Sequence, residues 1–259
     1  RLRVARTGDS CDYKALVALC TARLRITPDH YRDRPHAVLT RVNALRERHL
    51  ATGDIAPLRL VARTYNNEAR RTLLRRPQPD DALARAATWR LNAARMWRTL
   101  FRIGGNVGDL DRALATTTAV ITETETISRV RREAMDLKAS ILRQRFRARG
   151  DRTDLDVAVD LGRELLAAAR RAAALRDIAW SLGGLGQSLA IRAEAFGSKR
   201  VDDHAEALAC FREAVGAQPP SDVWAASRLA SLAGQLRLQA DDVVRAGVAT
   251  PTGAATRTG

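Results

Sequence analysis

The sequence predicts an all-α protein in which about five helix-turn-helix repeats stack into a right-handed superhelical solenoid. Three observations support this prediction. Apolar residues in the stretch 182–219 recur three and four apart, a spacing that places them on one helical face. A glycine followed by a polar residue recurs at a near-constant interval, and Asp-Leu-Asp-x-Ala occurs twice after that turn. Alanine is abundant and aromatic residues make up 4% of the chain, a composition that suits closely packed helices.

The stretch 182–219 defines the repeat unit. Its first helix carries Leu182, Leu185 and Leu189 on one face, and Gly186 lies on the same face. A glycine inside a helix costs about 1 kcal/mol relative to alanine, so we expect Gly186 to allow close helix packing. The second helix carries small and aromatic residues four and three apart and is followed by a proline that stops it. These residues are Ala207, Phe211, Ala214 and Pro219.

A turn with glycine separates the two helices of each repeat. Successive turn glycines are 45, 52, 45 and 47 residues apart. We expect the glycine to end the first helix and a nearby aspartate to cap the second. The paired aspartates that begin at Asp109 and Asp154 are interpreted as caps, because they lack the glycine and distal glutamate of a calcium loop. The five turns are Gly8-Asp9, Gly53-Asp54, Gly105-Asn106, Gly150-Asp151 and Gly197-Ser198.

The helices are expected in pairs along the chain. Residues 1–7 end a first helix whose beginning is missing, 11–27 form its partner, and 29–35 are a connector. Residues 77–81 form a loop, because each proline there disfavours helix at the preceding residue. A last helix at 221–240 has no clear partner. The intervening pairs are 36–51 with 56–74, 82–103 with 110–126, 129–148 with 155–174, and 175–196 with 203–217.

Residues 116–122 conflict locally with this scheme. The segment is β-branched and could form a strand on propensity alone. We predict a helix, because its place in the repeat requires one and packing overrides weak propensity. The repeat array is expected over residues 1–243, followed by a disordered tail at 244–259. Neither end looks like a polar cap, so we expect a fragment with an incomplete N-terminal repeat.

No catalytic or metal-binding pattern is found. Cys11, Cys20 and Cys210 form an odd set without paired spacing and are expected to be buried thiols. Only His30 and His36 lie near each other, whereas a zinc site needs three or four converging ligands. No nucleophile has a nearby candidate base. We therefore predict a protein that is not an enzyme and has no cofactor or metal. Because there is no long apolar run or signal-like start, a cytoplasmic protein without membrane association is expected.

Arginine dominates the charge of the chain. Lys and Arg number 44 against 29 Asp and Glu, and the net charge is +15. Only Lys14, Lys138 and Lys199 are lysines. This excess predicts attraction to acidic partners or nucleic acid.

Many of the arginines recur at fixed places before the turn glycines. Arg1, Arg46, Arg98 and Arg143 each lie seven residues before a turn glycine, and Arg192 lies five before Gly197. A second arginine follows two residues later at Arg3, Arg48 and Arg145. Stacked repeats would align these positions into a ladder. One interpretation is a basic groove, rimmed by tryptophan, that grips an acidic peptide. The other is that cations near helix C-termini complement the helix dipole. The expected groove residues are Arg46, Arg90, Trp97, Arg98, Arg143, Trp180 and Arg192.

These segments resemble a known repeat family. The spacing of small, aromatic and proline residues in 182–219 resembles the tetratricopeptide repeat (TPR). The sequences 148–156, 105–111 and 142–146 look like the long-repeat arrays of actinobacterial proteins that often end in a CHAT domain, a caspase-like cysteine peptidase domain. The resemblance implies a TPR-like solenoid that senses or scaffolds a partner within a larger multidomain protein. Lys138 and Arg41 stand where the family has small residues, which puts packing there in question.

Two functions from different classes are therefore expected. The first is a scaffold that binds a protein or an acidic peptide. The alternative is nucleic-acid binding through the arginine-rich surface, which would show a steep salt dependence. Few aromatic residues are interleaved with the basic ones, an arrangement that does not favour single-strand binding.

Overall fold

The computed structural model describes residues 10–28, 31, 33–74, 81–124, 128–196, 201–217, 229–230, 232–234 and 236. Every regular element in this part of the chain is a helix, and no strand occurs in it. The chain divides into two compact units, Arg1–Asp151 and Arg152–Gly259.

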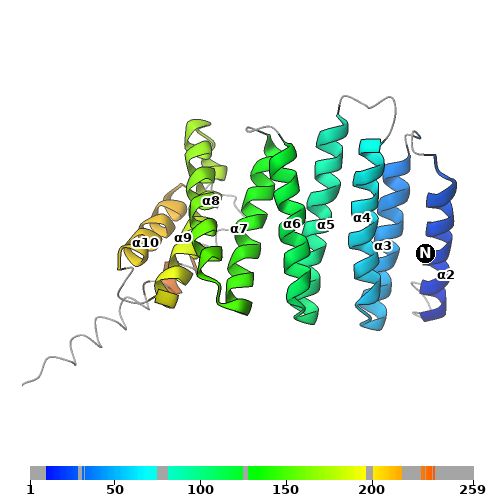
Figure 1. The fold of residues 1–259 in the computed structure, drawn as a ribbon, viewed down its shortest axis with the longest axis horizontal. Helices are drawn as coiled ribbons and strands as arrows, with labels where there is room; N and C mark the ends of the chain where they lie inside the picture. The colour runs from blue at the N-terminus through cyan, green and yellow to red at the C-terminus, as the bar shows by residue number, and fades with distance from the viewer. Residues whose placement is uncertain are drawn as a thin grey trace, which may run out of the picture. The chain divides into compact units, whose positions relative to one another are not determined.

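Six helices make up the described part of the first unit, and each packs on the next in chain order. They stand side by side in Figure 1, and α5 contacts α7 in addition to α6. In the described part of the second unit, α9 packs between α8 and α10. The first unit contains α2 (Ser10–Ile26), α3 (Arg34–Thr52), α4 (Ala56–Leu74), α5 (Ala82–Gly104), α6 (Val107–Glu123) and α7 (Arg129–Arg149). The second contains α8 (Arg152–Arg171), α9 (Leu175–Phe196) and α10 (Val201–Gly216).

The prediction of an all-α fold is confirmed, and the helices predicted between residues 11 and 217 are present with small shifts at their ends. Other expectations lie outside the described residues. These are the helix end at 1–7, the turns at Gly8 and Gly197, the loop residues 77–80 and the tail at 244–259. Most of the helix expected at 221–240 also lies outside them.

In three repeats a glycine ends the first of the two helices, as expected. Gly53, Gly105 and Gly150 have φ angles of 68°, 68° and 75°, a left-handed conformation that glycine adopts without a Cβ clash. Each donates its backbone N–H to the carbonyl four residues earlier, at 2.6 to 2.8 Å. At the start of α4, Asp54 accepts a hydrogen bond from the Ala56 N–H at 2.9 Å. The turn chemistry of the repeat is therefore confirmed at these positions.

The capping role expected for Asp109 is wrong. Helix α6 begins at Val107, and the Asn106 side chain caps it by accepting from the Gly108 N–H at 3.0 Å. Asp109 therefore lies inside the first turn, where it is 1% exposed and accepts a hydrogen bond from Arg112 at 2.7 Å. Asp154 is also 1% exposed and lies inside the first turn of α8.

The threonine-rich segment is helical, as predicted. Its hydroxyl groups donate to carbonyls within their own helix: Thr116 bonds to Arg112 and Thr122 to Thr118. Thr117 is fully buried and donates to the Ala113 carbonyl at 3.1 Å. These three hydroxyls are thus satisfied locally, so burial of one helix face decides the conformation over β-propensity.

Close packing at Gly186 is also confirmed. A Cβ at this position would lie 2.9 Å from the Phe211 ring, closer than a real Cβ contact allows. Gly162 of α8 makes a similar approach to Leu185, where a Cβ would lie 3.2 Å from the Leu185 backbone. Ala207 and Ala214 join Phe211 in the core of the second unit. Small residues thus set the separation of α8, α9 and α10.

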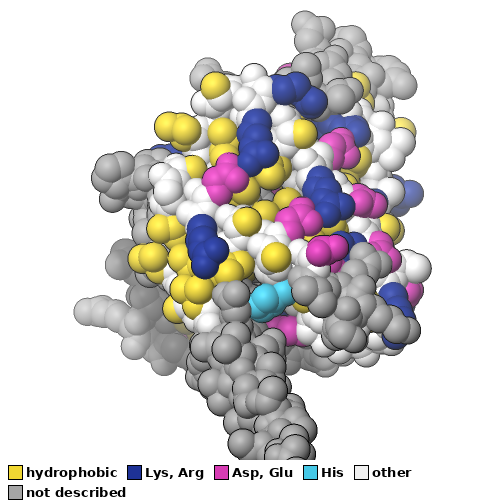
Figure 2. Space-filling model, turned by 90° about the vertical axis from the view of Figure 1, so that its left-hand side faces the viewer, with side chains coloured by type: hydrophobic (Ala, Val, Ile, Leu, Met, Phe, Trp, Pro, Cys, Tyr) yellow, Lys and Arg dark blue, Asp and Glu magenta, His cyan; other side chains and the backbone are white. Residues whose placement is uncertain are grey.

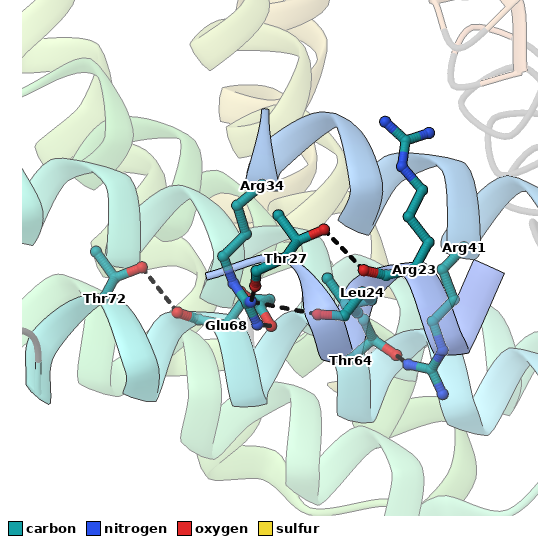
Figure 3. A network of polar contacts seen from close by, with 8 residues as sticks. All are labelled: Arg23, Leu24, Thr27, Arg34, Arg41, Thr64, Glu68 and Thr72. Carbon is teal, nitrogen blue, oxygen red and sulfur yellow. Dashed lines mark hydrogen bonds and ion pairs between the residues drawn. The ribbon is translucent and has the colours of Figure 1, made fainter. Parts of the chain in front are cut away.

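Two arginines cap the C-terminal ends of α2 and α6, each the second helix of its repeat. The sequence pattern did not predict these caps. Figure 3 shows Arg34 at the start of α3, where its guanidinium donates to the Leu24 and Thr27 carbonyls of the preceding turn. It also pairs with Glu68 at 2.9 and 3.0 Å. Arg131 makes the equivalent contacts at the end of α6, to the carbonyls of Ile121 and Thr124. Residues 34 and 35, expected in a connector, therefore belong to α3.

Arg41 fits its helix interface despite its size. Figure 3 shows its side chain beside α4, where the guanidinium donates to Thr64 Oγ1, and it also donates to Thr21 Oγ1 at 3.0 Å. Burial lowers the pKa of Arg41, and the charge of Glu68 partly offsets this effect. The position therefore replaces the small residue of the resembled family with a polar bridge between α2, α3 and α4.

Candidate partner-binding site

The arginine ladder separates into two sets with different surroundings. One set consists of Arg145 and Arg192, which lie five residues before a turn glycine. These arginines form ion pairs between neighbouring helices. Arg145 of α7 lies 3.4 Å from Asp111 of α6, and Arg149 pairs with the same carboxylate at 2.7 Å. Arg192 of α9 pairs with Asp156 of α8 at 2.8 Å. Because Asp111 and Asp156 are equivalent in the repeat, Arg192 corresponds to Arg145 and not to Arg143.

Arg192 is held as a buried structural clamp. Its Nε and Nη2 atoms each donate to Asp203 at 2.7 Å, and the residue is 5% exposed. The hydrogen bonds that Arg192 donates to Asp203 raise the pKa of Arg192, with a further contribution from Asp156. Its donors are directed at carboxylates of its own unit, so the expected groove role does not fit its position.

Trp97 and Arg90 also differ from the expected groove arrangement. Trp97 is 6% exposed and packs in a core cluster of the first unit, with the Arg112 guanidinium 5.2 Å from its ring centre. Its place in the core corrects the expectation that it rims a groove. Arg90 forms an ion pair with Glu123 of α6. Arg46 lies exposed on α3, and Trp180, 41% exposed, belongs to α9 of the second unit.

Arg98 and Arg143 come together where α5 meets α7. These helices run in the same direction, because residue pairs across them advance together. Arg95 contacts Glu133 at 2.8 Å, and one turn later Arg98 Nη1 donates to Ser140 Oγ at 2.9 Å. Residues three, four and seven apart share a helical face. The α5 stripe is Arg95, Arg98 and Arg102, and the α7 stripe is Glu133, Asp136, Ser140, Arg143 and Arg147.

The later half of this interface carries an excess of positive charge. We define the arginine seam as Arg98, Arg102, Arg143 and Arg147. Burial lowers the pKa of Arg143 to about 10, and Arg147 and Arg98 lower it further, while Asp136 raises it. Burial also lowers the pKa of Arg98, and Asp136 is again the carboxylate that opposes this change. The charge of Asp136 therefore acts on both guanidinium groups.

The hydrogen bonding of Arg98 is incomplete. Its Nε is buried without an acceptor among the described residues. A buried donor that lacks a partner costs about 1–3 kcal/mol, more when it is charged. Arg192 and Arg34 are buried too, but each has carboxylate partners at about 3 Å or less. The Nε of Arg131 in α7 likewise lacks an acceptor among the described residues, so incomplete bonding is not confined to Arg98.

Metal-ligand clusters and reactive thiols are two features that would point to reaction chemistry. No group of three or more His, Cys, Asp or Glu side chains among the described residues is placed to hold a metal ion. Cys20 and Cys210 are buried free thiols, and burial raises the pKa of Cys210 to about 11, which disfavours its nucleophilic thiolate form. In the same part of the chain, none of the helices is both long and apolar enough to span a bilayer.

Comparison with known proteins supports the fold alone. No family model and no curated protein sequence matches the chain. The structure is similar to the crystal structure of BtubC (BKLC) from P. vanneervenii, with a TM-score of 0.50 over 95% of this chain and 96% of that one. The sequences are 14% identical.

Ser140 and Asp136 belong to the site, although the spacing of the arginines did not predict them. The missed signal was the three-and-four spacing of Glu133, Asp136, Ser140 and Arg143 within one helix. That spacing places all four on one stripe, but the sequence does not say which helix faces it.

Proposed function

We propose that this chain is a TPR-like helical-repeat scaffold whose first unit binds an acidic segment of a partner protein at the arginine seam. The observation that carries the proposal is Arg98, which donates to Ser140 across the interface while its buried Nε has no acceptor among the described residues. An acidic side chain of a partner would supply the missing acceptors through charge-assisted hydrogen bonds. Helical arrays commonly offer such faces to partners, and the all-α hairpin fold is consistent with this role.

The resemblance to arrays that accompany CHAT domains extends this proposal. On that basis the chain serves as the sensing or scaffolding portion of a larger multidomain protein. The right-handed superhelix expected of a TPR array remains a prediction.

Peptide binding to the whole chain tests the proposal. A labelled glutamate-rich peptide is titrated by fluorescence anisotropy, beside a glutamine-rich peptide of equal length. We expect only the acidic peptide to bind, and we expect Arg98→Gln to weaken binding about tenfold, since a charge-assisted bond is worth about 1.5–3 kcal/mol. Arg59→Gln, at an exposed position of α4, removes the same charge away from the seam and serves as the control.

Three results would contradict the proposal. One is equal binding of the two peptides, and another is no binding of either. The third is an equal loss in Arg98→Gln and Arg59→Gln, because binding would then depend on net charge alone and not on the seam.

Nucleic-acid binding is the second candidate, because the net charge is +15. Figure 2 shows that basic and acidic side chains alternate with hydrophobic ones on the face at the α10 end of the chain. In the second unit, Arg163 pairs with Glu206 and Arg170 with Glu213, at 2.8 and 2.6 Å. These pairs interrupt the basic surface. Duplex DNA that binds as tightly as the acidic peptide, with affinity unchanged in Arg98→Gln, would favour this candidate.

A further inference from the structure

Helices α2 and α4 present a common outer surface. They lie side by side, because the Arg41 guanidinium of α3 donates both to Thr21 of α2 and to Thr64 of α4. About one turn farther along both helices, Arg34 makes a second bridge between them (Figure 3), so α2 and α4 run in the same direction. Positions 45 residues apart, the interval between the first two turn glycines, are therefore equivalent in these two helices.

Five exposed cations occupy this surface. Lys14 of α2 is equivalent to Arg59 of α4, and Arg25 is equivalent to Arg70. Arg63 lies four residues after Arg59 and shares its helical face. None of the five forms a hydrogen bond or an ion pair with a described residue. We name these five residues the basic face.

The two helices offer few carboxylates to balance the basic face. Glu68, the one acidic residue of α4, is buried and pairs with Arg34 at 2.9 Å. Asp12, the one acidic residue of α2, lies in its first turn. In the second unit, by contrast, Arg163 and Arg170 of α8 each pair with a glutamate of α10. The basic face therefore presents charge of one sign, which attracts polyanions.

Exposed aliphatic side chains lie among these cations. Ile26 follows Arg25 at the end of α2 and is 81% exposed, and Leu74 at the end of α4 is 76% exposed. Leu60 follows Arg59 and is also exposed. A nucleic-acid backbone has no apolar surface for such side chains, and base stacking uses aromatic groups. An anionic bilayer suits both kinds of residue, because its headgroups attract Lys and Arg and its acyl boundary accepts aliphatic groups.

We propose that the basic face docks this protein on the surface of an anionic lipid bilayer. The five cations approach the headgroups, while Ile26, Leu60 and Leu74 enter the boundary of the acyl chains. Docking of this kind needs no helix that spans the bilayer. The basic face and the arginine seam lie on different helices, so this inference does not depend on the proposed function.

Cosedimentation of the whole chain with lipid vesicles tests the inference. Vesicles of phosphatidylserine mixed with phosphatidylcholine are compared with vesicles of phosphatidylcholine alone. We expect binding to the anionic vesicles only. Raising the salt concentration from about 0.1 to about 1 M should weaken this binding, because the screening length falls from about 10 to about 3 Å.

A triple variant tests the cations. Arg59→Gln, Arg63→Gln and Arg70→Gln together should weaken binding to anionic vesicles about a hundredfold, at about 1 kcal/mol for each arginine. Arg98→Gln at the arginine seam should leave vesicle binding nearly unchanged. A matched control removes three charges from exposed positions of the second unit and should lose much less affinity than the first triple variant: Arg163→Gln, Arg170→Gln and Arg212→Gln.

A double variant tests the aliphatic side chains. Ile26→Ser with Leu74→Ser keeps the net charge and alters exposed side chains alone, so the fold should be preserved. We expect it to weaken binding to anionic vesicles about tenfold, because less apolar surface leaves water on docking. Leu50→Ser with Ile103→Ser, at exposed positions near the ends of α3 and α5, should leave binding unchanged.

Four results would overturn the inference. The first is equal binding to both kinds of vesicle, or binding to neither. The second is an equal loss in the two triple variants, because net charge alone would then account for binding. The third is unchanged binding in Ile26→Ser with Leu74→Ser. The fourth is a duplex oligonucleotide that binds more tightly than the anionic vesicles and loses affinity in the first triple variant, which would assign the basic face to nucleic acid.

Discussion

At the scale of single residues, arginine performs three separate tasks in this chain. Arg34 and Arg131 close the ends of second helices by donating to backbone carbonyls. Arg192 joins α9 to carboxylates of α8 and α10. Arg98 and Arg143 lie at the arginine seam, where burial lowers the pKa of both and the Arg98 Nε has no acceptor among the described residues. The surroundings of the guanidinium groups therefore differ between these three sets, and only the third set carries the proposed binding role.

Replacing Arg192 tests the structural task. Arg192→Met should lower the free energy of unfolding by about 3–5 kcal/mol, because it leaves the buried Asp203 carboxylate without its partner. Urea denaturation followed by circular dichroism measures the change. Arg163→Met, which breaks the exposed pair with Glu206 in the same unit, should cost less than about 1 kcal/mol. Similar losses in the two variants would show that burial of the Arg192 clamp contributes nothing.

Replacing Arg143 should have the opposite effect on stability. Its folded pKa of about 10 is below the ordinary value of 12.5, so the charged form is penalised in the folded state. This penalty is constant near neutral pH and diminishes only as the pH rises through about 10. Arg143→Met should therefore leave the free energy of unfolding unchanged or raise it by about 1 kcal/mol, while acidic-peptide binding falls. A loss of several kcal/mol in urea denaturation would assign Arg143 to the fold instead.

At the scale of helices, the sequence predicted the elements better than their contacts. Helix α6 was predicted correctly despite its β-branched segment, because the repeat spacing outweighed local propensity. The cap of α6 was not predicted correctly: Asn106 takes the place expected for Asp109, because α6 begins a few residues earlier than expected. Arg98 and Arg143 were found by their spacing from the turns. The lateral packing of α5 on α7 decides which arginines meet and which carboxylates face them. The periodicity within one helix does not reveal how two helices pack.

Gly186 offers a test of packing between two helices. Gly186→Ala should gain up to about 1 kcal/mol of helix propensity, but the new Cβ would meet the Phe211 ring at 2.9 Å. We expect a net loss of about 1–3 kcal/mol from overpacking. Adding Phe211→Leu should relieve part of this clash, so the double variant should be more stable than the sum of the single changes. Additive losses in thermal denaturation would mean that the two side chains do not compete for space.

At the scale of the whole molecule, the excess of positive charge acts against the folded state. Ion pairs between neighbouring helices offset part of the repulsion, as at Arg149 with Asp111 and Arg170 with Glu213. They cannot remove it, because basic residues outnumber acidic ones by 44 to 29. Exposed pairs contribute little, whereas a net charge of +15 repels itself over the whole surface.

Salt should therefore stabilise this protein. Raising sodium chloride from about 10 to about 100 mM shortens the screening length from about 30 to about 10 Å, which weakens long-range repulsion more than contacts within ion pairs. We expect the melting temperature to rise by several degrees. Replacing the exposed Arg59, Arg63 and Arg70 of α4 by glutamate removes two charge units at each site and lowers the net charge from +15 to +9. The salt response of that variant should be clearly smaller. A melting temperature that falls with salt in the unmodified chain would mean that ion pairs outweigh the repulsion, and the excess of arginine would then be a stabilising feature of the fold.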